Sequence, residues 1–331
     1  LGLDLKIADR FDLTVDIFRD HREDIFIRRG FLPGTTGLLV GGSIDQRPWG
    51  NVGSMRSEGI DGNFGYTQRI GKDFIFTLRG NLTYAYNKVL KYDEAANALY
   101  YRMTQGYKWE QNRGLIALGL FKDEAEIASS PTQYGQELMP GDIKYKNLNG
   151  DTVIDENDQT AIGDSYLPKL QYSFSLAASY KGFDLFALFQ GAAGRDVNLL
   201  DAPLQNVAFR DNGNVYGIAE GRWAYYPEQG IDTRATATYP RLSLQDNSNN
   251  YRNSTLWKRS GDFLKLRNVE LGYTFAQPSL SKAGISKIRI YLSGVNLLTV
   301  SRLMRDYDID PEILSGHPAL KSYNLGLTVT F

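Results

Sequence analysis

Apolar and polar residues alternate along several separate stretches of the chain, and the final stretch does so without interruption. Between Ser322 and Phe331, every second residue is apolar and the residues between them are small or polar. The apolar set is Tyr323, Leu325, Leu327, Val329 and Phe331, and the other set is Asn324, Gly326, Thr328 and Thr330. Because successive side chains of a strand point to opposite faces of a sheet, this pattern predicts a β-strand with one apolar face.

The same alternation predicts about nine strands, and the connections between them differ sharply in length. The predicted strands are 1–7, 11–17, 60–67, 74–87, 170–179, 183–190, 268–275, 287–293 and 322–331. Short turns such as 8–10 and 181–182 alternate with long excursions such as 88–167, which contains a short helical candidate at 122–127. The glycine-rich segment 23–52 has no sustained period and is predicted to be a loop. Outer-membrane β-barrels have such alternating connections, with short periplasmic turns and long extracellular loops.

The alternating pattern fits both a soluble β-sandwich and a membrane barrel, because the apolar face points to a core in one and to lipid in the other. The predicted strand 74–87 is much longer than the about five or six residues usual in globular proteins. Tyrosine and phenylalanine also gather at predicted strand ends, where the aromatic girdles of a barrel lie. Together with the connection lengths, these features favour an all-β fold, namely a transmembrane antiparallel β-barrel in a Gram-negative outer membrane with long extracellular loops.

Composition removes several classes of function. The 37 lysines and arginines nearly cancel the 38 acidic residues, so no overall charge attracts nucleic acid. The chain has no cysteine, which excludes disulfides and thiolate metal sites. No run of about 18 apolar residues occurs, so a spanning helix is not expected, whereas a membrane β-strand needs only about 9 to 11 residues.

The order of the strands suggests a piece of a longer protein. The chain begins with Leu1 rather than methionine, inside a predicted strand. An odd number of strands is also unusual, because single-chain bacterial barrels close with an even number. We therefore expect residues 1–331 to form the C-terminal portion of one β-barrel domain, with further strands upstream. Because the final strand follows a long loop, Phe331 is expected at the periplasmic rim.

An acidic stretch before the strand 170–179 is the best candidate for a metal site. The Ca²⁺ loop of an EF-hand supplies oxygen ligands at fixed positions, and this stretch offers oxygens at all of them. They are Asn147, Asn149, Asp151, the carbonyl of Val153, Asp155 and Asp158. Two positions depart from that pattern, because Asn147 lacks the usual charge and Thr152 stands where glycine is usual. One interpretation is a structural Ca²⁺ that fixes an extracellular loop, and the other is a surface turn rich in Asn and Asp.

The other candidate residues point to binding rather than to catalysis. Trp223, Tyr225 and Tyr226 offer rings that stack on a sugar or a peptide, although aromatics that pack a loop onto its neighbours are more common. Arg79 and Asn81 share the polar face of one strand, where they either contact a solute or plug inside the barrel or are merely solvated. The sequence has no nucleophile elbow, phosphate-binding glycine loop or metal-binding histidine pattern, so we do not expect an enzyme.

Several motifs taken together resemble one family. They are GDIKYKNLNGD (141–151), VID (153–155), YKGFDL (180–185), FQG (189–191), YPRL (239–242), FLKLRNV (263–269), LGY (271–273) and IYLSGVNL (290–297). In these motifs the chain resembles the SusC/RagA group of TonB-dependent outer-membrane transporters. The resemblance covers essentially the whole chain, which corresponds to the C-terminal third of that family.

The resemblance implies a barrel of about 22 strands that is occluded by an N-terminal plug. It also implies two partners, a SusD-like surface lipoprotein that covers the barrel and TonB, which would act through the N-terminal region. The solutes of the family are mostly oligosaccharides and sometimes peptides.

Two hypotheses from different classes follow. The first is TonB-dependent import of a nutrient, an oligosaccharide or alternatively a peptide, across the outer membrane. The second is a soluble secreted all-β module that binds glycans through Trp223 and Tyr226. A requirement for detergent separates them, because only the barrel exposes its apolar face to lipid.

Overall fold

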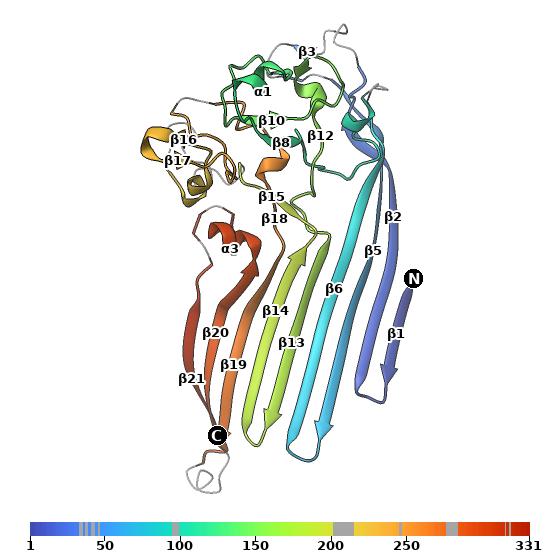
Figure 1. Ribbon diagram of the computed structural model, residues 1–331. Coiled ribbons are helices and arrows are strands. Elements are labelled where there is room, and N and C mark those ends of the chain that lie inside the picture. The colour runs from blue at the N-terminus through green and yellow to red at the C-terminus, as the bar shows by residue number, and fades with distance from the viewer. Residues whose placement is uncertain are drawn as a thin grey trace.

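The computed structural model describes residues 1–32, 36, 39–40, 44–45, 47–94, 99–200, 215–244, 247–275, 284–314, 316–317 and 319–331. Within these ranges, nine long strands form a single sheet in sequence order, and every neighbouring pair is antiparallel (Figure 1). The strands are β1 (Gly2–Ile7), β2 (Phe11–Arg28), β5 (Trp49–Ile70), β6 (Phe74–Lys91), β13 (Leu170–Tyr180), β14 (Phe183–Ala193), β19 (Phe263–Phe275), β20 (Lys287–Ser301) and β21 (Ser322–Thr330). The nine predicted strands and the all-β fold class are therefore confirmed.

Short elements fill the loop end of the sheet. The short strands are β3 (Leu39–Val40), β4 (Ile44–Asp45), β7 (Arg113–Gly114), β8 (Ala117–Leu120), β9 (Thr132–Gln133), β10 (Ile143–Tyr145), β11 (Val153–Ile154), β12 (Thr160–Ala161), β15 (Asp196–Asn198), β16 (Tyr225–Tyr226), β17 (Ile231–Asp232) and β18 (Lys258–Ser260). The α-helices are α1 (Glu124–Ala128) and α3 (Arg302–Tyr307), and the 3-10 turns are Tyr100–Arg102, Glu156–Asp158, Gly217–Gly221, Pro227–Gln229 and Thr255–Trp257. The predicted helix near 122–127 is confirmed by α1, whose N-terminal amide of Glu126 donates to Asp123. In the described part of the chain, no helix has the length and apolar character needed to cross a membrane.

The prediction that 23–52 is entirely loop is wrong at both ends. β2 continues to Arg28 and pairs with β5 from Trp49 onward. The period is lost there because the pairing shifts register around Arg22 and Ile25, where Asp24 adopts a left-handed backbone (φ +52°). Part of the predicted loop, including 33–35 and 41–43, lies outside the described residues.

The connections at the other end of the sheet are tight where they are described. β13 and β14 join through two residues, Lys181 (φ +46°) and Gly182 (φ +90°), and Tyr180 pairs directly with Phe183. Two successive left-handed residues are the signature of the hairpin turn whose twist matches that of the strands. The sheet thus has short turns at one end and long loops at the other (Figure 1).

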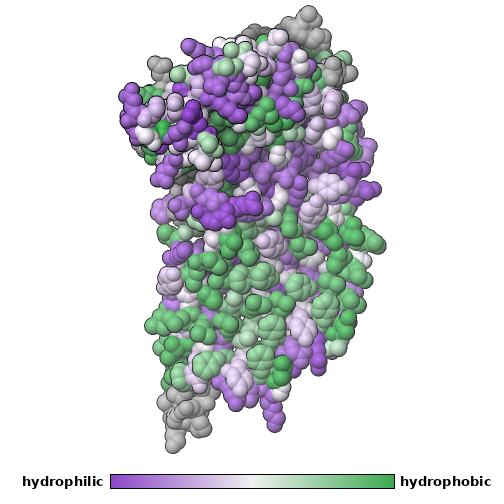
Figure 2. All heavy atoms as spheres, viewed as in Figure 1, coloured by the Kyte–Doolittle hydropathy of each residue, from purple (hydrophilic) through white to green (hydrophobic). Residues whose placement is uncertain are grey.

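One face of the sheet is apolar and open. On β21, Tyr323, Leu325 and Leu327 are 76%, 74% and 64% exposed, and Leu292 beside them on β20 is 59% exposed. Figure 2 shows these residue types as a continuous hydrophobic band over the strands, with a hydrophilic surface over the loops. Soluble proteins rarely expose an apolar area of this size without a partner that covers it.

The opposite face is polar and is cross-linked by ion pairs. Arg289 of β20 reaches across β19 to Asp184 of β14, with 3.0 Å between Nε and Oδ1, and it also pairs with Glu270 at 2.6 Å. The guanidinium passes over Gly272, where a Cβ would lie 2.5 Å from Nη2. A glycine at this position therefore allows one arginine to join three strands.

Replacing Gly59 tests how closely β5 and β6 approach each other. A Cβ at Gly59 would lie 2.2 Å from the backbone oxygen of Tyr84 and 3.0 Å from the Cα of Ala85. We expect Gly59→Ala to cost about 1–3 kcal/mol of stability, the usual range for overpacking. The measurement is the heating temperature at which, on an SDS gel, the band of the compact folded protein shifts to the position of the unfolded protein. Gly217→Ala is the control, because a Cβ there meets nothing within 4 Å; equal temperatures for the two variants would contradict the expectation.

Candidate functional site: the loop assembly above the sheet

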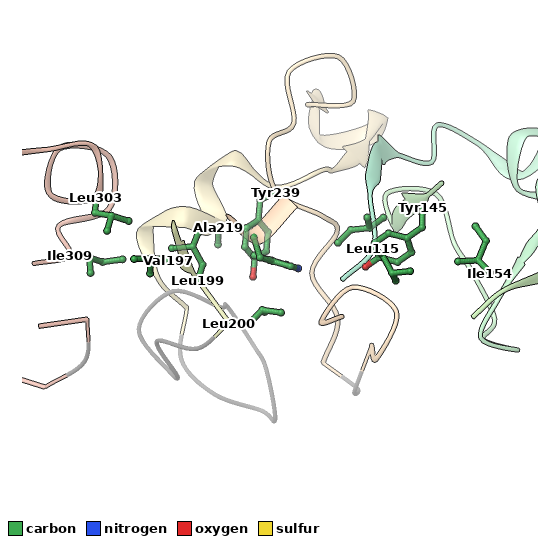
Figure 3. Packing of buried hydrophobic residues seen from close by; sticks show 12 residues of the cluster. Leu115, Tyr145, Ile154, Val197, Leu199, Leu200, Ala219, Tyr239, Leu303 and Ile309 are labelled. Atoms are coloured by element: carbon green, nitrogen blue, oxygen red, sulfur yellow. The ribbon is translucent and has the colours of Figure 1, made fainter. Parts of the chain in front are cut away.

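The long loops share one hydrophobic core, which holds segments that are far apart in sequence (Figure 3). The core contains Leu115, Ile143, Tyr145, Ile154, Val197, Leu199, Leu200, Ala219, Tyr239, Trp257, Leu303 and Ile309. Tyr239 and Trp257 meet edge to face with ring centroids 5.5 Å apart. Because this core draws on the loops after β6, β14 and β20, these three loops form one assembly rather than independent excursions.

A buried carboxylate organises the polar interior of this assembly. Asp142 is fully buried, and its Oδ1 accepts hydrogen bonds from Arg241 Nε (2.7 Å), Asn247 Nδ2 (2.9 Å) and Asn250 Nδ2 (2.9 Å). Its Oδ2 accepts from the backbone amide of Met139 at 2.9 Å. A buried charge is stable only when it is paired and hydrogen-bonded in this way. The network ties the start of the 141–151 stretch to the loop that precedes β18.

Neighbouring polar groups extend the network toward the hydrophobic core. Gln133 is fully buried; it donates to the carbonyl of Ile143 (2.8 Å) and accepts from the amide of Tyr145 (2.8 Å). The Tyr145 hydroxyl donates to the carbonyl of Asn249 at 2.6 Å, and burial raises its pKa well above the ordinary value. Tyr145 is therefore a neutral hydrogen-bond donor, not an acid or base.

The predicted ion loop is folded by its own hydrogen bonds. The side-chain oxygens of Asn147, Asn149 and Asp151 accept from the backbone amides of residues 150, 151 and 153 at 2.6, 3.0 and 2.8 Å. Gly150 supplies the left-handed residue (φ +78°), so the turn does not require glycine at Thr152. The structure thus brings the first half of the predicted ligand set into one compact turn.

The second half of the loop is closed by Asp158, which is fully buried. Its two oxygens accept from the amides of Leu148 (2.6 Å) and Asp155 (3.0 Å), and Asp155 in turn caps the 3-10 turn Glu156–Asp158. In the described residues, no three His, Asp or Glu side chains converge as a metal site. The predicted set also includes amide and carbonyl oxygens, and binding of Ca²⁺ by Asn147, Asn149, Asp151, Val153, Asp155 and Asp158 stays a prediction.

The aromatic candidates lie on a small hairpin made by β16, β17 and the turn between them. Trp223 is half-buried and packs on Gly141, where a Cβ would lie 2.6 Å from its ring. Tyr225 and Tyr226 are 44% and 52% exposed. The guanidinium of Arg234 lies 3.6 Å from the centre of the Tyr225 ring. Trp223 therefore anchors the start of the hairpin, and both tyrosines are partly exposed, with Arg234 over one face of the Tyr225 ring.

The polar-face candidates belong to the sheet rather than to this hairpin. Arg79 is exposed on β6, and Asn81 two residues further on accepts a hydrogen bond from Ser173 Oγ at 3.1 Å. Both lie well before the loop end of β6, so the structure does not join them with Tyr225 and Tyr226 in one site.

A charged cluster that was not predicted from the sequence fastens the loop after α3 to β19 of the sheet. Lys265 of β19 is fully buried and donates to Asp310 (2.8 and 2.9 Å) and Glu312 (2.7 Å). Burial alone would raise the pKa of Asp310 and Glu312, but hydrogen bonds and the positive charges of Lys265 and, for Glu312, Arg267 leave both pKa values below the ordinary range. Lys265 and Arg267 stand in the motif FLKLRNV (263–269), but nothing in the sequence pairs that motif with Asp310, which lies 45 residues further on.

Known proteins give matches along the whole chain. The TonB-dependent receptor P3 of Formosa agariphila is 24% identical over 370 residues, covering 100% of this chain and 33% of that protein. The TonB-dependent receptor P26 of the same organism is 28% identical over 308 residues, covering 85% of this chain and 30% of that protein. Over most of its length the chain is similar in sequence to these TonB-dependent receptors. It spans about a third of the length of these relatives, and no family model matches it.

The receptor named SusC from Bacteroides thetaiotaomicron is 23% identical over 321 residues, covering 89% of this chain and 28% of that receptor. Among solved structures, the RagAB peptide importer in its closed-closed state superposes with a TM-score of 0.69 at 22% identity, covering 100% of this chain and 35% of that one. This likeness supports the fold, in which the sheet is part of a β-barrel. These relatives are receptors and transporters rather than enzymes, in agreement with the expectation from the sequence.

Removing the buried carboxylate tests whether the Asp142 network holds the loops. We expect Asp142→Ala to destabilise the loop assembly by about 3–5 kcal/mol, because it leaves Arg241 without its buried partner. Limited proteolysis should then cut within the loops while the strands stay protected. Asp232→Ala is the control, because Asp232 is exposed and its pair with Arg234 contributes little. Loops that resist protease equally in both variants would show that the network is not required.

The calcium prediction has its own test. We expect calorimetry of the receptor to detect Ca²⁺ binding that is lost in the double variant Asp151→Ala with Asp155→Ala, because a Ca²⁺ site needs carboxylate oxygens. Glu137→Ala, which removes one exposed carboxylate nearby, should leave binding unchanged. If calorimetry detects no binding of Ca²⁺ to the unaltered receptor, the calcium prediction is wrong and the loop is a turn held by its own hydrogen bonds.

Proposed function

We propose that the chain is part of an outer-membrane receptor that imports a nutrient in a TonB-dependent manner, together with a SusD-like surface lipoprotein. The apolar face of the sheet meets lipid, the polar face lines the lumen, and the long loops face outward. The plug and the contact with TonB belong to parts of the receptor other than this chain.

The exposed apolar face is the observation on which this proposal rests. It runs across nine strands and is paired with a polar face that satisfies its charges through Arg289, Asp184 and Glu270. A soluble glycan-binding module would have to cover this face with a second layer, whereas a bilayer covers it directly. The similarity to TonB-dependent receptors also supports a membrane receptor over a soluble module.

The proposed solute is an oligosaccharide that is captured at the hairpin of β16 and β17. Tyr225 and Tyr226 offer two exposed rings, and the hairpin is held firmly by Trp223 on Gly141. Sugar rings stack well on such aromatic surfaces because their C–H faces are apolar. A peptide is the second candidate, since the RagAB structures are named as a peptide importer.

Uptake by cells that produce the whole receptor tests both solutes. We expect the double variant Tyr225→Ala with Tyr226→Ala to weaken capture of fluorescent oligosaccharides about tenfold, at about 0.5–1.5 kcal/mol per stacked ring. Tyr100→Ala is the control, because Tyr100 is 75% exposed in another loop. Uptake of labelled peptides but not of oligosaccharides would select the second candidate. Purified receptor that stays monomeric without detergent would refute the membrane placement altogether.

A further inference from the structure

A cavity of about 600 Å³ lies where the sheet meets the loops. Its walls come from the loop ends of β13, β14, β19 and β20 and from α3. None of the candidate residues discussed above lines it.

The floor of the cavity belongs to the apolar face of the sheet. The strand register places Tyr172, Gly191, Leu264 and Val300 in one row across four strands. The Tyr172 ring lies over Gly191, where a Cβ would be 2.4 Å from the ring. Val300 is 56% exposed, as is its neighbour on the same face, Leu298, at 51%. The floor is therefore continuous with the apolar band that faces the membrane in the proposed function.

The edge of the cavity toward the loops carries two arginines, and Asp262 is also exposed in the lining. Arg302 and Arg305 of α3 both line it and are exposed, and α3 follows β20 immediately. Arg305 is paired with the exposed Asp306, so two arginines and one aspartate leave the helix with one net positive charge. Asp262, the acidic residue in the lining, uses Oδ1 to accept from the amide of Gly194 at 2.9 Å. In Figure 2, the hydrophilic surface meets the apolar band at the level of these strand ends.

We propose that this cavity binds the anionic, phosphate-bearing head group of a membrane lipid, with the acyl chains lying along Leu298 and Val300. This inference rests on the proposed function, since it needs the apolar face in a bilayer. Arg302 has no ion-pair partner among the described residues, whereas Asp306 holds Arg305. Arg302 therefore suits an anion, because arginine binds phosphate oxygens through paired N–H donors. An apolar floor below an edge that carries this arginine suits an amphiphile rather than a free ion, which would leave the floor uncovered.

The test uses the whole receptor in nanodiscs of phosphatidylcholine that contain a minority of phosphatidylglycerol. Native mass spectrometry after mild release measures the phosphatidylglycerol that stays bound to the protein. We expect retention well above that of phosphatidylcholine, and about tenfold weaker binding in the double variant Arg302→Gln with Arg305→Gln. The matched control, Arg69→Gln with Lys72→Gln, removes the same charge at the opposite end of the strands and should leave retention unchanged.

Each alternative occupant gives a different result. Equal retention in the arginine double variant, or equal retention of the two lipids, overturns the anionic head-group site. Inorganic phosphate that displaces phosphatidylglycerol at millimolar concentration also overturns it, because the ligand would then be a soluble anion. A receptor that enters the nanodisc and retains no lipid refutes this site alone, whereas one that never enters the bilayer refutes the proposed function and this site with it.

Discussion

The strict alternation of side chains across one broad sheet is the constraint on which the rest of the structure depends. A strand cannot place two successive residues on one face, so nine paired strands with a period of two give two complete and opposite surfaces. Burying one exposed leucine-sized side chain is worth about 1.5–3 kcal/mol, and the apolar face has many of them. Such a surface is stable only against an apolar environment, and the polar face can then carry charges that bond across strands, as Arg289 does over Gly272.

The loops meet a different requirement. They extend beyond the sheet into water, where a period of two brings no advantage, and they build their own core instead. Asp142 and its amide and guanidinium partners fix how these segments meet, while Lys265 fastens the segment after α3 to β19. The exposed tyrosines of the small hairpin, where we propose that a solute is captured, stand on this fixed base.

The sheet could be predicted from the sequence because its signal is local and repeated, as in residues 322–331. The prediction failed in β2 beyond Ile17, because residues 19–24 are all polar and because the pairing with β5 shifts register around Arg22 and Ile25. A turn at Asn147 could also be predicted, since Asn and Asp side chains favour hydrogen bonds to nearby backbone amides. The cavity under α3 and the Lys265 cluster could not be predicted. The cavity depends on the register of four strands, and the Lys265 cluster forms only because the segment after α3 packs against β19.

Determining which face of the sheet contacts lipid tests the proposed membrane placement most directly. Residues 1–331 contain no cysteine, so a single cysteine with a nitroxide label can be placed at one position of the sheet at a time, in the whole receptor in a bilayer and with any cysteine elsewhere in the receptor replaced. Leu271, Leu292 and Leu325 form one row across three strands, and Ser293 and Asn324 lie in the next row. We expect oxygen dissolved in lipid to relax the labels of the leucine row, and a water-soluble nickel chelate to relax the labels at Ser293 and Asn324. Nickel access to both rows, without alternation, would contradict this placement.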